Sequence, residues 1–577
     1  MSKNSILSDF FNSLTIQEEK IYPILENDKS GMIFRSAINE LNLMNYKGIS
    51  EHNGTLGQDE YYYIFKLGVS RLLKITLEKN KNFDLPAVMF LRDSVISEET
   101  HYIVKGLGMI EHGRRVGQSV NSGYSEIDKD GKNSFRITLS SNLIDEENYE
   151  NTLSYLCKKN NLRKRNIFLS SEYIKKLNKE MSSKMIELVY IYNNHFIGYN
   201  SDPILDEYYF ALAYNELSNQ DGFDTFHFSA KIGGITFQNY KLAIAFIMSV
   251  ITKHEKFAES LIIKEPSILI ENILTTSLDS EEFIEHMCIA INYFGSQLQE
   301  HSPLELRDAK KIFEVLSYSR SNIKILDRPS AELPMLIQSS KSNFFCCIAA
   351  RYSAPLQYLH DSLRFNFSKE YDKLQQSREK SLQNTIKIIF DNNFNGLKYI
   401  DNIKIKENGK IKTDIDLIII EEKTGSVFLC QLKHQDLYGS DIHAKHIRTT
   451  RLKEQASYWL STINSWLDKT SNEKIRKTLQ INRKLKNLKF YKIFITRHYA
   501  FSLKDISKSH DTSYFNLLQL FNTIKEAIQD NENTEKSIST IIEKSKELEA
   551  TFGDIKYIKE PPSIWKIDDL CFSVIHG

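Results

Sequence analysis

Apolar and polar positions follow two different periods in the segment from residue 371 to residue 499. Apolar residues spaced three and four apart indicate helices, whereas short runs rich in isoleucine and valine indicate buried strands. A glycine-containing break between the second and third of these runs is typical of a β-hairpin. The predicted order is helix, three strands, helix and strand, over residues 371–390, 399–405, 415–420, 427–433, 452–467 and 488–496.

Helical spacing dominates the chain before residue 329, with strand-like patches in its first part. Pro329 and Pro334 interrupt helix and strand alike and therefore predict a linker. We predict an α+β multidomain protein with a mostly helical N-terminal part that carries small strand insertions. Its divisions are a mixed α/β N-terminal region (1–150), a mainly helical region for sensing, oligomerisation or regulation (151–328), a linker and connecting helix (329–370), a C-terminal α/β domain (371–510) and a helical extension packed on that domain (511–577).

Glycines and arginines are concentrated between residues 106 and 117. Their spacing fits neither the Walker A loop nor the dinucleotide-binding fingerprint. We interpret this segment as a glycine-rich connection with a solvated arginine pair. Contact of Arg114 and Arg115 with an anion is the alternative.

Composition narrows the class of protein. The 75 basic and 74 acidic residues nearly cancel, so any surface that binds nucleic acid must be local. The six cysteines form no Cys-x-x-Cys pair, which argues against a zinc ribbon or a disulfide framework. The longest apolar run is far below the roughly 20 residues that a spanning helix needs. We therefore expect a soluble, cytoplasmic protein without a membrane partner.

Four polar side chains stand at the ends of the second and third predicted strands. Asp414 and Asp416 begin the second strand, and Gln431 and Lys433 end the third. Residues two apart share one face of a strand, and the start of one antiparallel strand lies beside the end of its neighbour. We therefore expect these side chains to converge on one place. Capping of the strand is the alternative role for Asp414.

Such a group of side chains suits the hydrolysis of a phosphodiester. A carboxylate and a second oxygen ligand can hold Mg²⁺, which keeps several waters and binds a substrate phosphate. The metal ion polarises the phosphoryl oxygen and lowers the pKa of a bound water. An ammonium such as that of Lys433 orients this water and offsets the charge that develops on the phosphate.

Asp416 followed by Gln431-Leu432-Lys433 resembles the Asp…(Asp/Glu)-x-Lys signature of the PD-(D/E)xK nuclease superfamily. Glutamine in place of the acid is similar to the variant in Mrr-like restriction nucleases. The resemblance covers residues 371–499 and implies a restriction-endonuclease-like α/β domain with deoxyribonuclease activity. It implies Mg²⁺, with Mn²⁺ as a substitute, held by Asp416 and Gln431, and a catalytic role for Lys433.

A helix before the first strand often supplies one more acidic residue to the site in this family. Glu379 matches that place, because it lies on the apolar stripe of the predicted helix over 371–390. A carboxylate on such a stripe is costly unless it is paired or binds a metal ion. The alternative is an exposed glutamate at the edge of the stripe.

Cations follow Lys433 in the next loop and at the start of the next helix. Phosphate is attracted both by these cations and by the positive end of the helix dipole. We expect four of them to contact the DNA backbone. These residues are Lys445, Arg448, Arg451 and Lys453. A zinc site formed by His434, His443 and His446 is the alternative, for which no fourth ligand is evident.

The predicted function is a metal-dependent DNA endonuclease that acts as the effector of a bacterial restriction or anti-phage defence system. The assignment to defence is an analogy at the level of the fold. Expected partners are DNA, with RNA as an alternative substrate, together with a second copy of the chain or a defence-system protein. Two other functions are compatible with the sequence. These are a catalytically inactive nuclease fold that binds DNA, and a scaffold or oligomerisation protein.

Overall fold

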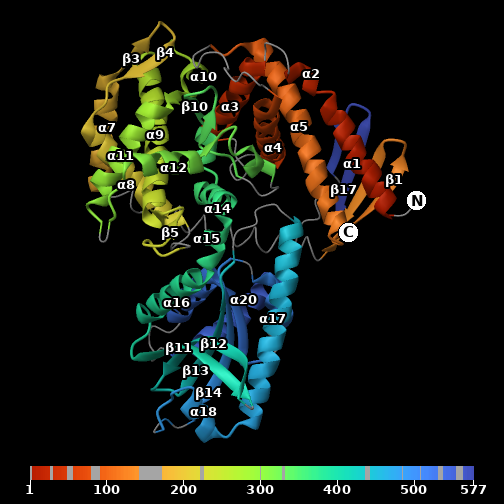
Figure 1. Cartoon of the computed structure of the whole chain (residues 1–577), viewed down its shortest axis with the longest axis vertical. Coiled ribbons are helices and arrows are strands. Elements are labelled where there is room, and N and C mark those ends of the chain that lie inside the picture. Colours follow the sequence, from red (N-terminus) through yellow and green to blue (C-terminus); the bar gives the residue numbers. More distant parts are fainter. Residues whose placement is uncertain are drawn as a thin grey trace.

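The computed structural model describes residues 3–25, 30–48, 56–79, 91–141, 172–220, 226–298, 301–327, 332–407, 409–435, 442–483, 485, 487–498, 500–506, 509–529, 537–553 and 563–576. It is a mixed α/β protein with several small sheets. Figure 1 shows a lower part, residues 375–553, below a larger and mainly helical upper part that contains both ends of the chain. None of the described helices is long and apolar enough to cross a membrane.

Long helices at the start of the chain pack closely because of two glycines. A Cβ atom on Gly68 would lie 1.9 Å from the carbonyl oxygen of Val104, and one on Gly108 would lie 2.0 Å from that of Ile64. Only glycine permits such an approach. The segment 106–117 lies within the helix Ser94–Asn121, so its interpretation as a glycine-rich connection is wrong. The helices are α1 (Lys3–Glu19), α2 (Tyr22–Leu25), α3 (Ser30–Tyr46), α4 (Leu56–Lys79) and α5 (Ser94–Asn121).

The rest of the upper part packs around α9 (Phe237–Lys264), whose buried residues occupy nearly all of its circumference in the first half. A helix that is apolar all round belongs inside a large core. The surrounding elements are α7 (Glu172–Leu188), β3 (Val189–Tyr192), β4 (Phe196–Tyr199), α8 (Pro203–Gln220), β5 (Lys231–Ile232), β6 (Ile235–Thr236), α10 (Ile270–Ile273), α11 (Ser280–Gly295), α12 (Leu306–Leu316), η1 (Ile323–Asp327) and α13 (Ile348–Arg351).

The segment expected to be a linker is largely part of this core. Two of its stretches form β9 (Leu336–Gln338) and β10 (Asn343–Cys346), which join β7 (Ser277–Asp279) and β8 (Ser317–Tyr318) in the order β7-β10-β9-β8. Leu336 and Ile337 are completely buried. Pro334 does not prevent this structure, because it precedes β9. Residues 328–331, which include Pro329, lie outside the described residues.

The last strands of the chain return to the upper part. β1 (Ser125–Gly131) and β2 (Ser134–Leu139) form a hairpin, and β17 (Leu570–His576) runs parallel to β2 with β16 (Ser563–Ile567) at the edge. The segment 511–577 was expected to pack on the C-terminal domain. The structure divides it, because its helices belong to the lower part and its final hairpin completes a sheet with β1 and β2.

The lower part contains the predicted order of helix, three strands, helix and strand, with a short helix inserted before the last strand. Its sheet has the order β11-β12-β13-β14-β15, in which β11, β12 and β13 are antiparallel and β13, β14 and β15 are parallel. The elements are α16 (Gln375–Asp391), β11 (Leu397–Glu407), β12 (Lys410–Glu421), β13 (Ser426–Lys433), α17 (Ile442–Lys469), α18 (Asn472–Thr478), β14 (Lys489–Thr496), η2 (Phe501–Ile506), β15 (Thr512–Asn516), α19 (Leu517–Gln529) and α20 (Thr540–Gly553).

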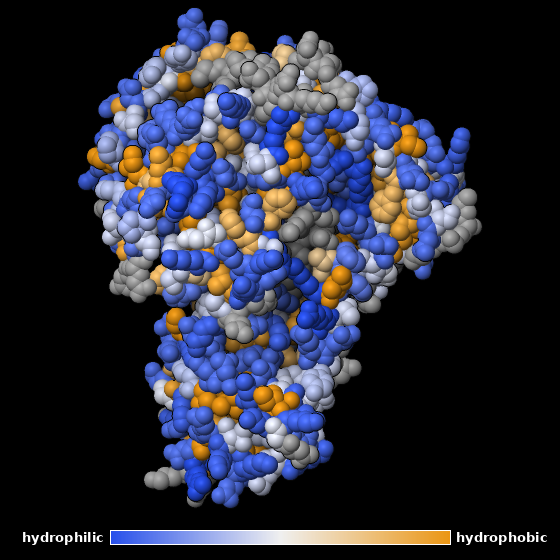
Figure 2. All heavy atoms as spheres, viewed as in Figure 1, coloured by the Kyte–Doolittle hydropathy of each residue, from blue (hydrophilic) through white to orange (hydrophobic). Residues whose placement is uncertain are grey.

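Helices cover both faces of this sheet. Leu417 and Ile419 of β12 face α16, α19 and α20, whereas Ile418 and Ile420 face α17. Both faces of the central strands are therefore buried, as the continuous apolar runs predicted. The face of the molecule seen in Figure 2 is mostly hydrophilic, with hydrophobic atoms in small separate groups.

A buried cation marks the junction of the two parts. α14 (Pro355–Asn366) and α15 (Ser368–Lys373) lead down to α16 (Figure 1). Arg378, near the start of α16, is completely buried, and its guanidinium lies 5.2 Å from the ring centre of Phe226 and 5.0 Å from that of Tyr371. Such cation–π contacts stabilise a desolvated guanidinium. They also fix the start of α16, which bears Glu379.

Candidate functional site

The site lies where β12 and β13 separate. Their paired register extends from Glu421 and Ser426 to Leu417 and Cys430, one residue short of Asp416. Asp416 Oδ2 instead accepts a hydrogen bond from the backbone N–H of Leu432 at 2.7 Å. The carboxylate of one strand thus replaces the backbone acceptor that a continuing ladder would have supplied.

Gln431 follows Cys430, the partner of Leu417, on β13 between β12 and β14, so it stands across from Asp416 just beyond the end of the paired register. Its side chain is 5 % exposed, and its Oε1 atom is buried with no hydrogen-bond partner among the described residues. An unsatisfied buried acceptor costs about 1–3 kcal/mol, so its presence calls for an explanation. A cation in front of Asp416 would satisfy it.

Asp416 is held in a state that is unusual for an aspartate. Burial raises its pKa to about 7, although the Leu432 N–H and the charge of Lys433 act to lower it. The neighbouring charges of Asp414 and Glu379 raise it further. The site therefore has more negative charge than its own cation compensates, which is the condition that a bound metal ion relieves.

Glu379 reaches the same site from α16. Its side chain is partly buried, and burial raises its pKa while Lys433 lowers it and Asp414 raises it. The charges of Asp414 and Lys433 thus act on both Glu379 and Asp416, although no three acidic side chains among the described residues are arranged to hold a metal ion by themselves. Asp414 itself is exposed, at the rim of the group.

Two further side chains, which no sequence pattern singled out, hold the backbone in the middle of β12 (Lys410–Glu421). The Gln383 amide donates to the carbonyl oxygen of Asp416 at 2.5 Å, and the Trp459 indole N–H donates to that of Asp414 at 2.7 Å. Gln383 belongs to α16 and Trp459 to α17, so helices on opposite faces of the sheet hold the same short stretch of β12. The available signal for Gln383 was its position four residues after Glu379, on the same face of the helix.

The four cations expected to contact DNA differ in exposure. Lys445 is only 4 % exposed, so its expected role as a backbone contact is wrong for this structure. It lies where the start of α17 packs against the upper part, since His443 Nδ1 is 3.3 Å from Ser122 Oγ and the His446 ring meets that of Tyr124 edge-on. Arg448 is partly buried, and Arg451 and Lys453 are exposed.

The alternative zinc site is not formed. No group of three or more His, Cys, Asp or Glu side chains within the described ranges could hold a metal ion. His434 is buried after β13, near His498, whereas His443 is exposed on α17. The histidines of the proposed zinc site are therefore not gathered in one place.

A Mg²⁺ site of the expected kind needs fewer protein ligands. Mg²⁺ is usually bound by one or two carboxylates together with waters and substrate phosphate oxygens. Asp416 and the unpartnered Oε1 of Gln431 are oxygen ligands of this kind, and the charge of Glu379 acts on Asp416. The residues present therefore fit a metal ion that a substrate phosphate completes.

Comparisons with protein family models, with curated proteins and with solved structures gave no match to this chain. The geometry and electrostatics of the site are therefore what a functional assignment rests on. Its charged side chains lie near the point where two strands separate, so single substitutions can test the role of each.

Proposed function

We propose that the protein is a metal-dependent DNA endonuclease of the PD-(D/E)xK type, and that its active site is formed by Asp416, Gln431, Lys433 and Glu379. One observation carries this proposal. Asp416, whose carboxyl pKa is raised to about 7, and Gln431, whose buried side-chain oxygen has no partner among the described residues, stand across from each other where two strands separate. Buried, uncompensated groups of this kind are concentrated at functional sites.

Each residue then has a distinct role. Bound Mg²⁺ or Mn²⁺ would supply a Lewis acid for the phosphoryl oxygen and a water of lowered pKa. Asp416 and Gln431 provide its oxygen ligands, and Glu379 is the third acidic group at the site. The Lys433 ammonium orients the attacking water and stabilises negative charge in the transition state. Water attacks phosphorus, the bond to the leaving oxygen breaks, and that oxygen takes up a proton.

The proposed substrate is DNA, with RNA as an alternative. Arg451 and Lys453 are exposed on α17, which flanks the sheet that bears the site (Figure 1). Phosphate contacts from such side chains hold a nucleic acid without reading its sequence. The role as a defence effector, with the upper part as the controlling part and a second chain or another protein as partner, rests on analogy alone.

A catalytically inactive nuclease fold that binds DNA is the second candidate. It is favoured by the uncharged Gln431 and by the lack of a group of three metal-binding side chains among the described residues. The two candidates differ in their dependence on metal ions, because an inactive fold would bind DNA equally well with and without Mg²⁺.

Cleavage of supercoiled plasmid and linear DNA tests the proposal. The purified protein is incubated with Mg²⁺, Mn²⁺ or EDTA, beside the variants Asp416→Asn and Lys433→Ala. Lys474→Ala is the matched control, because Lys474 is an exposed lysine of the lower part on α18. We expect cleavage that requires metal ions, falls by about 100-fold or more in both site variants and is unchanged in the control.

Metal-independent DNA binding without cleavage would favour the inactive fold. Cleavage that survives in both site variants would place the active site elsewhere. A parallel assay on single-stranded and structured RNA distinguishes the two substrates.

A further inference from the structure

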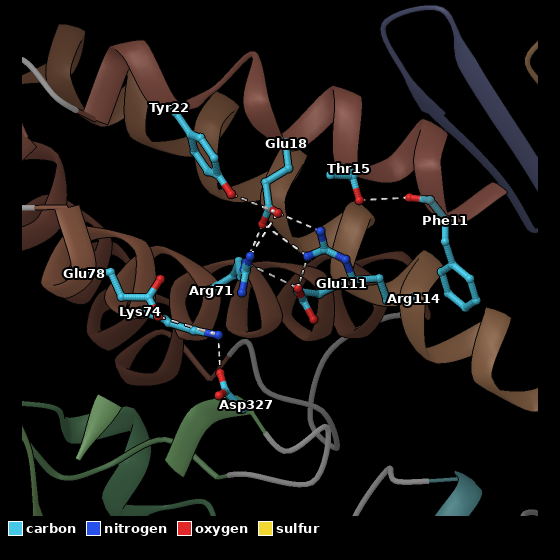
Figure 3. Close-up of polar contacts among 10 residues, drawn as sticks. All are labelled: Phe11, Thr15, Glu18, Tyr22, Arg71, Lys74, Glu78, Glu111, Arg114 and Asp327. Carbon is cyan, nitrogen blue, oxygen red and sulfur yellow. Dashed lines mark hydrogen bonds and ion pairs between the residues drawn. The ribbon is translucent and has the colours of Figure 1, made fainter. Parts of the chain in front are cut away.

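A cavity of about 310 Å³ lies in the upper part between α4, α5 and η1, outside the site described above. Four cationic side chains, Arg71, Lys74, Arg114 and Arg115, line it together with the acidic Glu111 and Asp327. Figure 3 shows several of these residues pointing toward one another from the two long helices. Its volume is at the lower end of the range for small-molecule sites, about 300–1,000 Å³.

Two of the guanidiniums are fixed from behind by a buried carboxylate. Glu18 is 2 % exposed and accepts hydrogen bonds from Arg71 Nη2 at 2.9 Å and Arg114 Nη2 at 2.6 Å. The Tyr22 hydroxyl donates to it as well, at 3.2 Å (Figure 3). Each arginine has five N–H donors, so this pairing leaves donors free to meet a ligand. Guanidiniums held in place in advance lose little freedom when they bind an anion.

The lining of the cavity has an excess of positive charge, with four cationic side chains against two acidic ones. Carboxylates outside the lining offset part of it, because Glu18 binds Arg71 and Arg114, and the exposed Glu78 lies 3.8 Å from Lys74. Lys74 forms an ion pair with Asp327, whose side chain is 43 % exposed and thus open to exchange with solvent. A phosphate would compete with Asp327 for the Lys74 ammonium and gain the nearby guanidiniums at once.

The cavity also has an unused acceptor and apolar walls. Gln118 lines the cavity, and its Oε1 atom is buried with no hydrogen-bond partner among the described residues, so a turn of its amide toward the cavity would give this oxygen a partner. An unpaired acceptor calls for a ligand that donates a hydrogen bond, such as a hydroxyl or an amino group. Leu67 and Leu326 add apolar surface to the lining. A bare inorganic anion would use neither feature.

We propose that this cavity binds a small organic phosphate with a hydrogen-bond donor, of the class of a mononucleotide or a sugar phosphate. Its Arg71, Lys74, Arg114 and Arg115 side chains hold the phosphate, and Gln118 accepts from the donor group. The cavity is too small for a nucleic acid chain. This proposal does not depend on nuclease activity and is tested without it.

Isothermal titration of the whole protein in EDTA measures this binding. The probes are AMP, GMP, ribose 5-phosphate and pyrophosphate, with adenosine as the uncharged comparison. The test variant is Lys74→Gln with Arg115→Gln, and Lys105→Gln is the matched control, because Lys105 is exposed on α5 and does not line the cavity. We expect at least one organic phosphate to bind, with affinity lowered about tenfold or more in the test variant and unchanged in the control.

Two further variants make the test directional. Asp327→Asn removes the competing carboxylate, so we expect tighter binding of the same organic phosphate. Gln118→Leu removes the acceptor, so we expect weaker binding of that phosphate and unchanged binding of pyrophosphate. The proposal is overturned if no organic phosphate binds more tightly than adenosine, or if the Lys74 and Arg115 variant binds it as well as the parent chain while its thermal unfolding shows an intact fold.

Discussion

Two carboxylates in different parts of the molecule have opposite titration behaviour. Glu18 in the upper part is almost completely buried, yet its pKa is lowered to about 2, whereas Asp416 in the lower part is partly buried and has a pKa raised to about 7. Burial acts to raise the pKa of both. Hydrogen bonds and charges from Arg71 and Arg114 overcome it at Glu18, and nothing of that strength acts on Asp416.

The comparison separates a completed ion pair from an incomplete one. The two arginines near Glu18 supply all the positive charge that this carboxylate needs, so it serves the fold and orients the cavity wall. Lys433 is the cation whose charge acts on Asp416; it also acts on Glu379, which in addition feels the charge of Arg378. Across from Asp416 stands Gln431, whose side-chain oxygen has no partner among the described residues. A structure that keeps such a group undercompensated is suited to bind a cation.

Neutralising each carboxylate is the strongest way to test this difference. Glu18→Gln leaves two guanidiniums without their buried counter-charge and should lower the free energy of unfolding by about 3 kcal/mol. Asp416→Asn removes an undercompensated charge and, without metal ions at pH 8, should raise it by on the order of 1 kcal/mol. Urea unfolding in EDTA measures both.

Asp568→Asn is the control for this pair of variants, because Asp568 forms an exposed ion pair with Lys20 and its loss should leave stability unchanged. If both Glu18→Gln and Asp416→Asn destabilise the protein to the same extent, the contrast between them is wrong.

The same contrast predicts a stability that falls at both ends of the pH range. The folded-state pKa of Glu18, about 2, lies below that of an unfolded glutamate, so its contribution is present above about pH 4.3 and is lost as pH falls toward 2. The folded-state pKa of Asp416, about 7, lies above that of an unfolded aspartate. Its contribution is therefore present below about pH 3.9 and is lost as pH rises to 7.

Urea unfolding of the metal-free protein between pH 3 and pH 8 measures this dependence. Asp416→Asn should flatten the curve between about pH 4 and pH 7, and Glu18→Gln should flatten it only below about pH 4.3. If the dependence of the unfolding free energy on pH is the same in both variants as in the parent chain, Glu18 and Asp416 are not the groups that cause it.

The site and the fold differ in how far the sequence predicts them. Isoleucine-rich runs predicted β12 and β13 because strands covered on both faces are apolar throughout. Helical spacing predicted that Glu379 lies on the apolar stripe of its helix, and on α16 its side chain is partly buried, because a position on a helix stripe is a local property. Its role at the site stays a prediction. The pairing of β17 with β2 joins residues more than 400 positions apart, and no local pattern records it. The burial of Lys445 similarly arises from packing of α17 against α5.

Added Mg²⁺ should act on only one of the two carboxylates. It completes the site at Asp416, so it should raise the thermal unfolding temperature of the parent chain at pH 8 and have less effect at pH 5, where Asp416 is protonated. Asp416→Asn should abolish this shift, and Glu18→Gln and Asp414→Asn should retain most of it. Differential scanning calorimetry measures the shift. An equal shift in Asp416→Asn would show that Mg²⁺ binds elsewhere.

Cationic side chains on α17 also differ in whether they are buried against other parts of the protein or exposed to solvent. We expect the effects of substituting them on DNA binding to be the smallest of those predicted here. Lys445 is buried at the contact with the upper part, whereas Arg451 and Lys453 are exposed. In the cleavage-deficient Lys433→Ala chain, Arg451→Gln and Lys453→Gln should each reduce the salt dependence of DNA binding by about one phosphate contact. Lys445→Gln should instead lower stability without changing that dependence. Fluorescence polarisation over a range of salt concentrations measures how steeply the affinity for DNA falls with salt. If this dependence were reduced only in Lys445→Gln, the start of α17 would have to leave the upper part to contact DNA.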